Sequence, residues 1–514
     1  MPGIASIQRT QAKDRLYTFL DEIRPALVEF VNDDSSKRWT PDPEFEADAD
    51  VVAHIESLEI PAVATRPSLL IHDLGRFQKE ATLKSRVDGI FQRNATTRVK
   101  ISVRSGFLVN TSGSGKTRIS FEGLCRHWGF YFIMECDGNR LGAADIGPTL
   151  YQGLDGERGF QDRLPPEDSP TFLEALKRNI EITHDKFSRV LLARLLVFQM
   201  FSEIIKPIGI TEAHKQRWLL FQLAPGIPGC GSSDILADLR QVFLYNLDAA
   251  GVQDLIAITF AKLQKIHGTD FHLFYVIDEA QLASRQHMRS YRHEGKEYPL
   301  LREIIQTWAT ESQPYQVSFV VLGTDIPKAG FESAPFADSI RWSSDTGSFD
   351  NEAEHRRYVS RFLLPSYASS AAGEMFLKRV WTWCRGRYRS TDAFLHVLLL
   401  DFFDSPHKLL NDYLATTTTH RPTDYVDDEP FRYPIVINLR ELKPNFFNTC
   451  RSSLLRSTVQ HVLFHYLATA RHPAPFSEEL TPLVSAGFGH FVAGDLSQVA
   501  MDEPMFLVRA AKWL

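Results

Sequence analysis

The chain contains 514 residues, of which 44% are hydrophobic and 23% charged, and this composition excludes a disordered protein. Its 57 basic and 63 acidic residues give a net charge of −6, so no overall basic field favours nucleic acid as a partner. The five cysteines are far apart and show no C-x-x-C spacing, which argues against a disulfide framework and a zinc site. We therefore expect a folded protein of a reducing compartment.

The N-terminal sequence does not resemble a targeting segment. MPGIASIQRTQAKDR lacks the apolar core of a signal peptide, and the most apolar helical run, residues 190–201, is too short to cross a membrane and contains Arg194. We expect an intracellular protein, cytoplasmic or nuclear, without a membrane partner. Export as an effector by another route stays open.

Residues 1–95 form the first predicted segment, which is helical and irregular and carries no catalytic pattern. A helical periodicity runs over residues 16–31, and the proline- and aspartate-rich stretch at residues 39–52 is typical of a solvated linker.

Residues 107–117, FLVNTSGSGKT, have the pattern of a buried strand that runs into a phosphate-binding loop. Small residues in the loop allow several backbone N–H groups to point at one anion, and the start of a helix adds a positive dipole end. Lys116 would reach the β- and γ-phosphates of ATP, and the Thr117 hydroxyl would bind Mg²⁺. The full pattern has glycine where this chain has Asn110, a residue that tolerates left-handed backbone angles. The predicted nucleotide-binding residues are Asn110, Ser112, Gly113, Ser114, Gly115, Lys116 and Thr117.

Residues 96–340 form the predicted ATPase core. Apolar runs at 99–103, 106–109 and 129–137 alternate with a helical pattern at 116–127, and this order predicts a parallel sheet with the loop at its C-terminal edge. Residues 140–268 are mainly helical in pattern and predict a large helical insertion packed on the core. The most specific function of the chain is expected in this insertion.

The stretch 271–281, FHLFYVIDEAQ, predicts a buried strand that delivers two carboxylates to the same edge. Asp278 would hold Mg²⁺, and Glu279 would polarise the attacking water. The stretch 315–325, YQVSFVVLGTD, predicts another buried strand that ends at Thr324. We expect this strand to lie between the loop strand and the acidic strand, where Thr324 would sense the γ-phosphate. Between these strands lie Arg285, Arg289 and Arg292. One of them would act in trans as a catalytic arginine, or all three belong to a solvated loop.

Two further segments complete the chain. Residues 341–430 predict a helical lid, and the arginines around Arg387 stand at a helix start, where positive charge is unfavourable unless it meets an anion. Arg387 or a neighbour would contact the γ-phosphate, unless this is an exposed basic turn. Residues 431–514 predict helices at 451–470 and 478–484 and then a hairpin around residues 493–495, which suits a small winged-helix-like module.

The sequence resembles the ATPase region of fungal Crinkler-like proteins, relatives of the oomycete Crinkler effectors. The resemblance spans roughly residues 65–514 and rests on the blocks SGSGKTRISFEGLCRHWGFYF, VIDEAQ, SSDTGSFD, GRYRSTDAFLHVLL, GFGHF and DEPMFLVRAA. It implies a fold similar to AAA-type and signal-transduction (STAND) ATPases, in a family where a nuclease-like or kinase-like domain often follows. Within these 514 residues we find no nuclease signature.

The predicted fold is therefore an α/β P-loop NTPase core with a helical insertion, a helical lid and a winged-helix-like module. The predicted function is Mg²⁺-dependent ATP binding and hydrolysis that drives a switch or motor for an effector domain, a partner chain or a homo-oligomer. Two alternatives stay open: a nucleotide-gated scaffold without useful turnover, and an ATP-dependent protein that acts on nucleic acid, which the net charge does not support.

Overall fold

The computed structural model describes residues 2–32, 38–41, 48–63, 65–75, 81–93, 105–134, 141–147, 150, 153–227, 231–332, 337–425, 453–469, 471–492 and 494–514, with side chains from residue 11 onward. The chain forms two compact units, each assembled from three stretches of sequence. Unit 1 comprises Met1–Ser35, Asp73–Phe107 and Ile119–Arg341, and unit 2 comprises Ser36–His72, Leu108–Arg118 and Trp342–Leu514.

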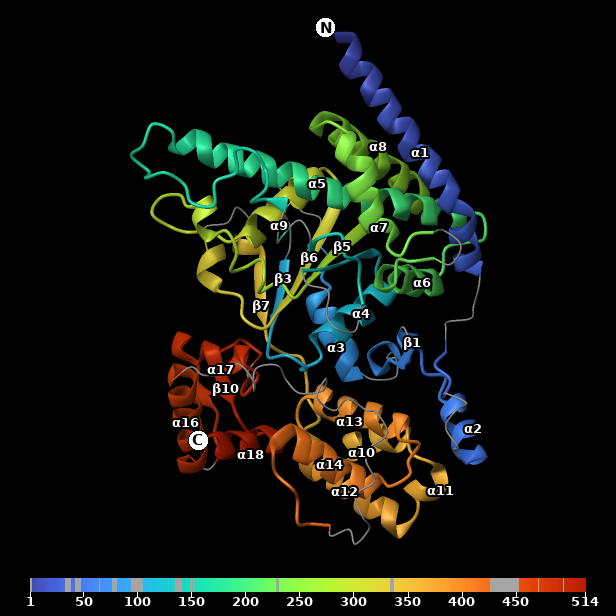
Figure 1. Ribbon diagram of the computed structural model, residues 1–514, viewed down its shortest axis with the longest axis vertical. Coiled ribbons are helices and arrows are strands. Elements are labelled where there is room, and N and C mark those ends of the chain that lie inside the picture. Colours follow the sequence, from blue (N-terminus) through green and yellow to red (C-terminus); the bar gives the residue numbers. More distant parts are fainter. Residues whose placement is uncertain are drawn as a thin grey trace. The chain divides into compact units, whose positions relative to one another are not determined.

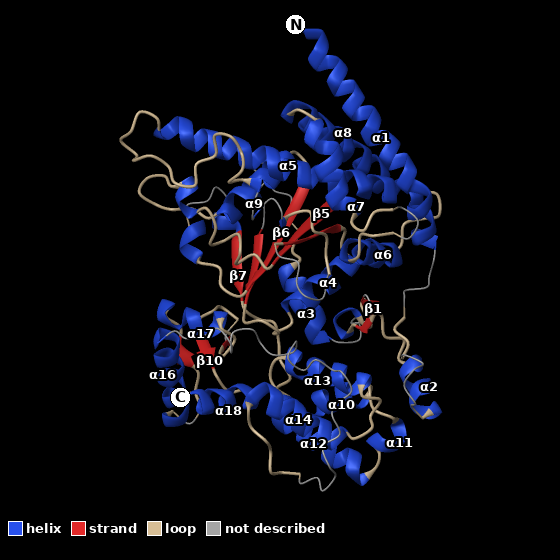
Figure 2. Cartoon of the chain, in the orientation of Figure 1, coloured by secondary structure: helices blue, strands red, loops and turns tan. Residues whose placement is uncertain are grey.

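A five-stranded sheet, drawn in red in Figure 2, organises unit 1, although the last two residues of two of its strands, 108–109 and 342–343, belong to unit 2. Its order is β4 (Gly129–Ile133), β5 (His272–Asp278), β6 (Gln316–Gly323), β3 (Ser105–Val109) and β7 (Ile340–Ser343). β4 and β5 pair in parallel up to Ile133 opposite Asp278, and β5 and β6 pair in parallel up to Ile277 opposite Val321. The expected position of β6, between the loop strand and the acidic strand, is confirmed.

The central strands form because their residues are apolar and aromatic on both faces. Every residue of β4 and β5 is buried, as expected for strands that helices cover on each side. Trp308 stacks on Phe132 with ring centroids 4.1 Å apart, and the Phe198 and Phe130 rings pack nearly perpendicular with centroids 5.8 Å apart. This aromatic layer fixes the strand ends that carry the candidate site.

Helices surround this sheet in unit 1. The longest is the 34-residue α5, and Figure 1 shows α1 and α8 beside it, in agreement with the contacts of α5 with each of them. The helices of this unit are α1 (Pro2–Asn32), α3 (Ala81–Ile90), α4 (Lys116–Arg126, whose first turn belongs to unit 2), α5 (Phe172–Ile205), α6 (Glu212–Leu223), α7 (Ile235–Asp238), α8 (Ala249–His267) and α9 (Leu300–Glu311). Short 3-10 or π turns are η4 (Leu239–Phe243), η5 (Leu244–Asn246), η6 (Met288–Tyr291), η7 (Lys328–Phe331) and η8 (Ala337–Ser339).

Unit 2 is mainly helical and has its own apolar core. Residues from α2, α10, α12, α13, α14 and α18 form one buried cluster, with Phe376, Phe394 and Leu398 fully buried in it. Its helices and small strands are α2 (Ala49–Ser57), β1 (Ala62–Val63), β2 (Arg66–Pro67), η1 (Leu69–Ile71), α10 (Glu352–Ser360), α11 (Pro365–Ala368), α12 (Ala371–Cys384), α13 (Tyr388–Leu400) and α14 (Pro406–Thr418).

The C-terminal part of unit 2 combines three helices with a small antiparallel sheet of order β8-β10-β9. Val499 lies opposite Phe491, which confirms the predicted hairpin, whereas the third strand, β8, was not predicted. The elements are α16 (Ser453–Ala468), β8 (Ala474–Pro475), η9 (Glu478–Leu480), α17 (Thr481–Ser485), β9 (His490–Phe491), β10 (Gln498–Ala500) and α18 (Pro504–Trp513).

The prediction of a linker over residues 39–52 is wrong for its last four residues, 49–52, which belong to α2. Asp48 accepts a hydrogen bond from the Asp50 N–H at 3.0 Å and caps α2, so the helix begins at Ala49. The strand expected at 99–103 and the end of the strand expected at 129–137 lie outside the described residues. Within the described part of the chain, no helix combines the length and apolarity needed to cross a membrane.

Candidate functional site

The predicted phosphate loop connects β3 to α4, and residues 108–118 belong to unit 2. Gly113 and Gly115 have φ values of 80° and 103°, a backbone region that glycine adopts without strain. A Cβ atom at Gly113 would lie 2.6 Å from the Arg389 Cβ, and one at Gly115 would lie 2.8 Å from the Tyr388 ring. Both glycines are therefore required by conformation and by space.

Lys116 begins α4 and folds back across its own loop. Its Nζ donates hydrogen bonds to the carbonyl oxygens of Asn110 and Thr111 at 2.6 and 2.8 Å, and the side chain is buried. The buried Ser114 hydroxyl has no hydrogen-bond partner within the described chain. An unsatisfied buried hydroxyl beside a helix start and a lysine fits a loop that binds an anionic phosphate group.

Asn110 acts differently from the prediction. It does not adopt a left-handed backbone, so tolerance of such angles does not explain its presence. Its side chain is buried and makes several hydrogen bonds instead. Oδ1 accepts from the Phe491 N–H at 3.0 Å, and Nδ2 donates to the carbonyl oxygens of Ser344 and Phe491 at 2.9 and 3.2 Å. Glycine could not make these contacts, so Asn110 joins the loop to β9 and to the segment after β7.

Arg387 lies next to the loop, but its charge is already engaged. Its Nε lies 2.7 Å from a Glu503 carboxylate oxygen, its Nη2 contacts the same carboxylate, and both side chains are almost fully buried. Nη1 donates to the Gly487 carbonyl at 2.8 Å and reaches the Ser112 carbonyl at 3.5 Å. Burial would raise the pKa of Glu503, but the charges of Arg387 and His490 and the hydrogen bonds from Arg387 hold this pKa below its usual value. Glu503 thus supplies the anion that the sequence argument required.

Arg389, two residues further on, presents its guanidinium to the loop. Nη1 donates to the Ser112 hydroxyl at 2.8 Å, and the Arg389 N–H donates to the Gly113 carbonyl at 3.2 Å. The side chain is exposed, unlike that of Arg387. Arg389 is therefore the basic neighbour whose position suits contact with a loop-bound anion.

The acidic pair stands at the end of β5 in unit 1. Asp278 is buried, with Oδ1 accepting from the Glu279 N–H at 2.8 Å and Oδ2 accepting from the Tyr131 hydroxyl at 2.9 Å. Glu279 leaves the strand with φ 53°, a left-handed value that is uncommon for glutamate. Such a backbone conformation persists only where the surrounding structure holds it, and residues of this kind are enriched at functional sites.

Gln281 connects two predicted site residues. Its Nε2 donates to a Glu279 carboxylate oxygen, and its Oε1 accepts from the Thr324 N–H at 3.2 Å. The structure thus brings Glu279 and Thr324 together through an amide that the prediction did not include. The only signal in the sequence was the position of Gln281 in VIDEAQ, two residues after the glutamate.

Tyr131 is a second residue that the sequence did not reveal, because a tyrosine in an apolar strand has the pattern of a core residue. Behind it lies a buried ion pair, in which Arg194 Nε and Nη2 each lie 2.8 Å from a carboxylate oxygen of Asp145 and neither side chain is exposed. Arg194 Nη1 also donates to the Tyr131 carbonyl at 2.9 Å. Helix α5 of the predicted insertion is therefore joined through Tyr131 to Asp278.

The three arginines proposed to act in trans have partners in this chain. Arg285 pairs with Asp325, Arg289 approaches Glu297 at 3.7 Å, and Arg292 approaches Glu167 at 3.6 Å. These contacts favour the solvated-loop interpretation.

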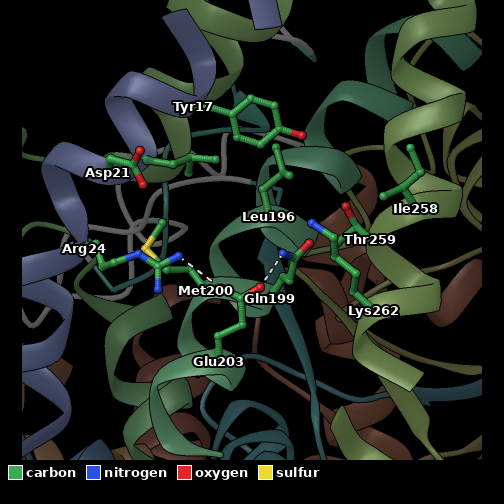
Figure 3. A pocket seen from close by; sticks show the side chains of 11 residues that line it. Tyr17, Asp21, Arg24, Leu196, Gln199, Met200, Glu203, Ile258, Thr259 and Lys262 are labelled. Carbon is green, nitrogen blue, oxygen red and sulfur yellow. Dashed lines mark hydrogen bonds and ion pairs between the residues drawn. The ribbon is translucent and has the colours of Figure 1, made fainter. Parts of the chain in front are cut away.

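A pocket of about 270 Å³ lies elsewhere in unit 1, where α1, α5 and α8 meet (Figure 3). Arg24 on α1 pairs with Glu203 on α5 at 3.1 Å, and Gln199 donates to the same carboxylate at 2.7 Å, as the dashed lines show. These polar side chains satisfy one another, so the pocket gives no evidence for a ligand.

Comparison with known proteins does not add to this geometry. No family model matches the chain, and neither the curated proteins nor the solved structures searched contain a significant match.

Proposed function

We propose that this chain binds ATP through the phosphate loop and hydrolyses it with Mg²⁺, as a nucleotide-driven switch of the Crinkler-like type that its sequence resembles. The observation that carries the proposal is the loop: two glycines with positive φ, a lysine that arches over the loop carbonyls, and an unsatisfied buried Ser114 hydroxyl at the start of an 11-residue helix. These features suit a polyphosphate better than a neutral ligand.

Each residue has a role in this proposal. Lys116 and the backbone of residues 112–115 hold the phosphates, and Thr117 and Asp278 hold Mg²⁺, which would neutralise charge on the transferred group. Glu279 orients the attacking water, and Gln281 fixes the Glu279 carboxylate and the Thr324 backbone relative to one another. Tyr131 keeps the Asp278 carboxylate in one orientation.

A nucleotide-gated scaffold is the second candidate, and the loop contacts favour it. Asn110 bonds to Phe491, Thr111 donates to the Val484 carbonyl at 3.1 Å, and Arg389 bonds to Ser112 and Gly113. A nucleotide that reshapes the loop would therefore alter its contacts with α13, α17 and β9 even without turnover.

ATP binding is tested with Lys116→Ala, because the variant keeps the loop glycines and loses the charge on the phosphates. At ATP near a hundred times its dissociation constant, the wild type should gain about 2.7 kcal/mol in stability, and the variant should gain almost none. Lys378→Ala, at an exposed lysine of α12 in the same unit, is the control and should keep the full shift. An undiminished shift in Lys116→Ala would place the nucleotide elsewhere.

Hydrolysis is tested with Glu279→Gln, which keeps size and hydrogen bonding but removes the base. It should bind Mg·ATP like the wild type and release phosphate about 10²- to 10⁴-fold more slowly. Glu294→Gln is a matched control, because Glu294 has a similar φ of 52° against 53° for Glu279 and is exposed. If wild type and Glu279→Gln both bind ATP tightly and both release negligible phosphate, the chain is a nucleotide-gated scaffold and not an ATPase.

A further inference from the structure

We propose a divalent metal site, suited to Zn²⁺, on Asp155, Asp162 and His287 in unit 1. Among the described residues, these three side chains bring one ligand atom each to within 4.8 Å of one another. The site is independent of the nucleotide proposal, and it uses no cysteine, which is why cysteine spacing gave no sign of it.

The distances agree with a shared ion. His287 Nδ1 lies 3.2 Å from an Asp162 carboxylate oxygen and 3.8 Å from an Asp155 carboxylate oxygen. Ligand atoms around tetrahedral Zn²⁺ lie roughly 3.3–3.6 Å apart, given zinc–ligand distances of about 2.0–2.2 Å. Both carboxylates are more than half exposed, so their oxygens have room to move by the few tenths of an ångström that would bring them to these distances from the imidazole nitrogen.

The imidazole is held ready for this role. The His287 side chain is only 7% exposed, and its ring meets the Phe160 ring edge-on at 5.2 Å. The residue has φ 53° and accepts a hydrogen bond from the Ser290 N–H at 2.9 Å through its carbonyl. The ring nitrogen that faces the carboxylates is thus fixed while the carboxylates are free to adjust.

The backbone on both sides of the site is fastened by one buried side chain. Asn179 on α5 exchanges two 2.8 Å hydrogen bonds with the backbone of Gln161, the neighbour of Asp162, and its Nδ2 donates to the Ser290 carbonyl at 3.0 Å. The Ser290 hydroxyl donates to the Asp162 carbonyl at 2.9 Å. These bonds fix the backbone that carries Asp162 and the turn after His287, and they leave the ligand side chains themselves available.

The ligand set indicates the ion. One imidazole and two carboxylates match the nitrogen and oxygen preferences of Zn²⁺, and three protein ligands leave a fourth position for water. The ion would tie the segment around residues 155–162 to the loop that follows the acidic strand. The competing interpretation is a metal-free cluster in which the imidazole contacts the two carboxylates directly.

The test uses the full chain, freed of nucleotide and stripped with chelator, and titrates it with ZnCl₂ by calorimetry and with CoCl₂ by visible absorption. We expect one Zn²⁺ to be bound at this site in the wild type. Asp162→Asn and His287→Asn should each weaken that binding by at least about 10- to 100-fold and abolish the cobalt spectrum. Asparagine suits position 287 because it tolerates the left-handed backbone there.

His293→Ala is the matched control, since it removes an exposed imidazole from the same loop, and it should bind Zn²⁺ like the wild type. Asp162 is exposed, so its variant keeps the test valid even if His287→Asn folds poorly. Absence of Zn²⁺ binding in the wild type, or equal affinity in all four proteins, would overturn the site and leave an ion-pair cluster.

Discussion

The phosphate loop in unit 2 and the end of β5 in unit 1 are each supported by a buried arginine–carboxylate pair, but in different ways. Arg387 and Glu503 are 6% and 3% exposed, and Arg387 reaches the loop directly through the Ser112 carbonyl. Arg194 and Asp145 are fully buried, and Arg194 is linked to Asp278 indirectly, through Tyr131.

This difference shows two ways to fix a chemical group. The loop has few apolar side chains, so polar contacts from residues far along the chain hold it, as between Asn110 and Phe491. The Asp278 carboxylate lies at the end of an aromatic core, so packing fixes the strand, and the Tyr131 hydroxyl and the Glu279 N–H orient the carboxylate. We expect loop variants to alter nucleotide binding and unit 2, and strand variants to alter metal dependence and unit 1.

The largest expected effect comes from removing either arginine. Arg194→Ala and Arg387→Ala each leave a buried carboxylate without its partner and should destabilise the folded protein by about 3–5 kcal/mol. Chemical denaturation with one spectroscopic probe in each unit should show the loss in unit 1 for Arg194 and in unit 2 for Arg387.

Arg356→Ala is the control for both, because its pair with Glu374 is exposed and should contribute only about 0–1 kcal/mol. If the buried variants lose no more stability than Arg356→Ala, the two pairs do not support the site as described.

The next largest effect is a pH dependence of stability that we expect for unit 2. Asp392 on α13, in unit 2, accepts a hydrogen bond from the Tyr358 hydroxyl at 2.8 Å. Burial raises its pKa from 3.8 to about 6, although this hydrogen bond and the charges of Arg118 and Arg389 act in the opposite direction.

Between pH 3.8 and about pH 6, Asp392 keeps its proton in the folded chain and loses it in the unfolded chain, so the free energy of unfolding falls as pH rises. Above pH 6 the charged, buried carboxylate lowers the free energy of unfolding by about 3 kcal/mol. Asp392→Asn should therefore stabilise the protein by up to that amount at pH 8 and by almost nothing at pH 4, as measured by denaturation at both values. If Asp392→Asn stabilises the protein equally at pH 4 and pH 8, the gain comes from packing and not from the charge of Asp392.

Tyr131→Phe tests the acidic end alone and rests on the proposed function. It removes the donor to Asp278 while keeping the ring, so we expect a roughly tenfold higher Mg²⁺ requirement for ATP turnover and a stability loss of about 1 kcal/mol. Tyr275→Phe is the matched control, because its buried hydroxyl pairs with Ser312 instead. A similar change in Mg²⁺ dependence in both variants would show that Tyr131 has no specific positioning role.

The smallest effect concerns Arg389, which replaces Arg387 as the candidate γ-phosphate contact. Arg389→Ala should weaken ATP binding by about 3- to 10-fold and ADP binding less, with a stability change within about 0.5 kcal/mol. Binding titrations of both nucleotides decide this, with Arg385→Ala as the control. Equal losses for ATP and ADP would make Arg389 part of a basic turn only.

Local patterns in the sequence determined much of the secondary structure around the site. The strand, loop and helix at residues 105–126, the buried acidic strand and the C-terminal hairpin follow from short-range rules, because backbone conformation, burial period and turn chemistry depend on neighbouring residues. The same rules identified Lys116, Asp278 and Glu279 as candidates.

Tertiary structure alone decided which side chains meet. Glu503 is 116 residues from Arg387, and His287 is 125 residues from Asp162, so no local period could pair them. The same holds for the contact of Asn110 with Phe491 and of Tyr131 with Asp278, and for compact units that interleave three stretches of chain each. Such contacts depend on how distant elements pack, and a buried polar group takes whichever partner that packing brings within hydrogen-bond distance.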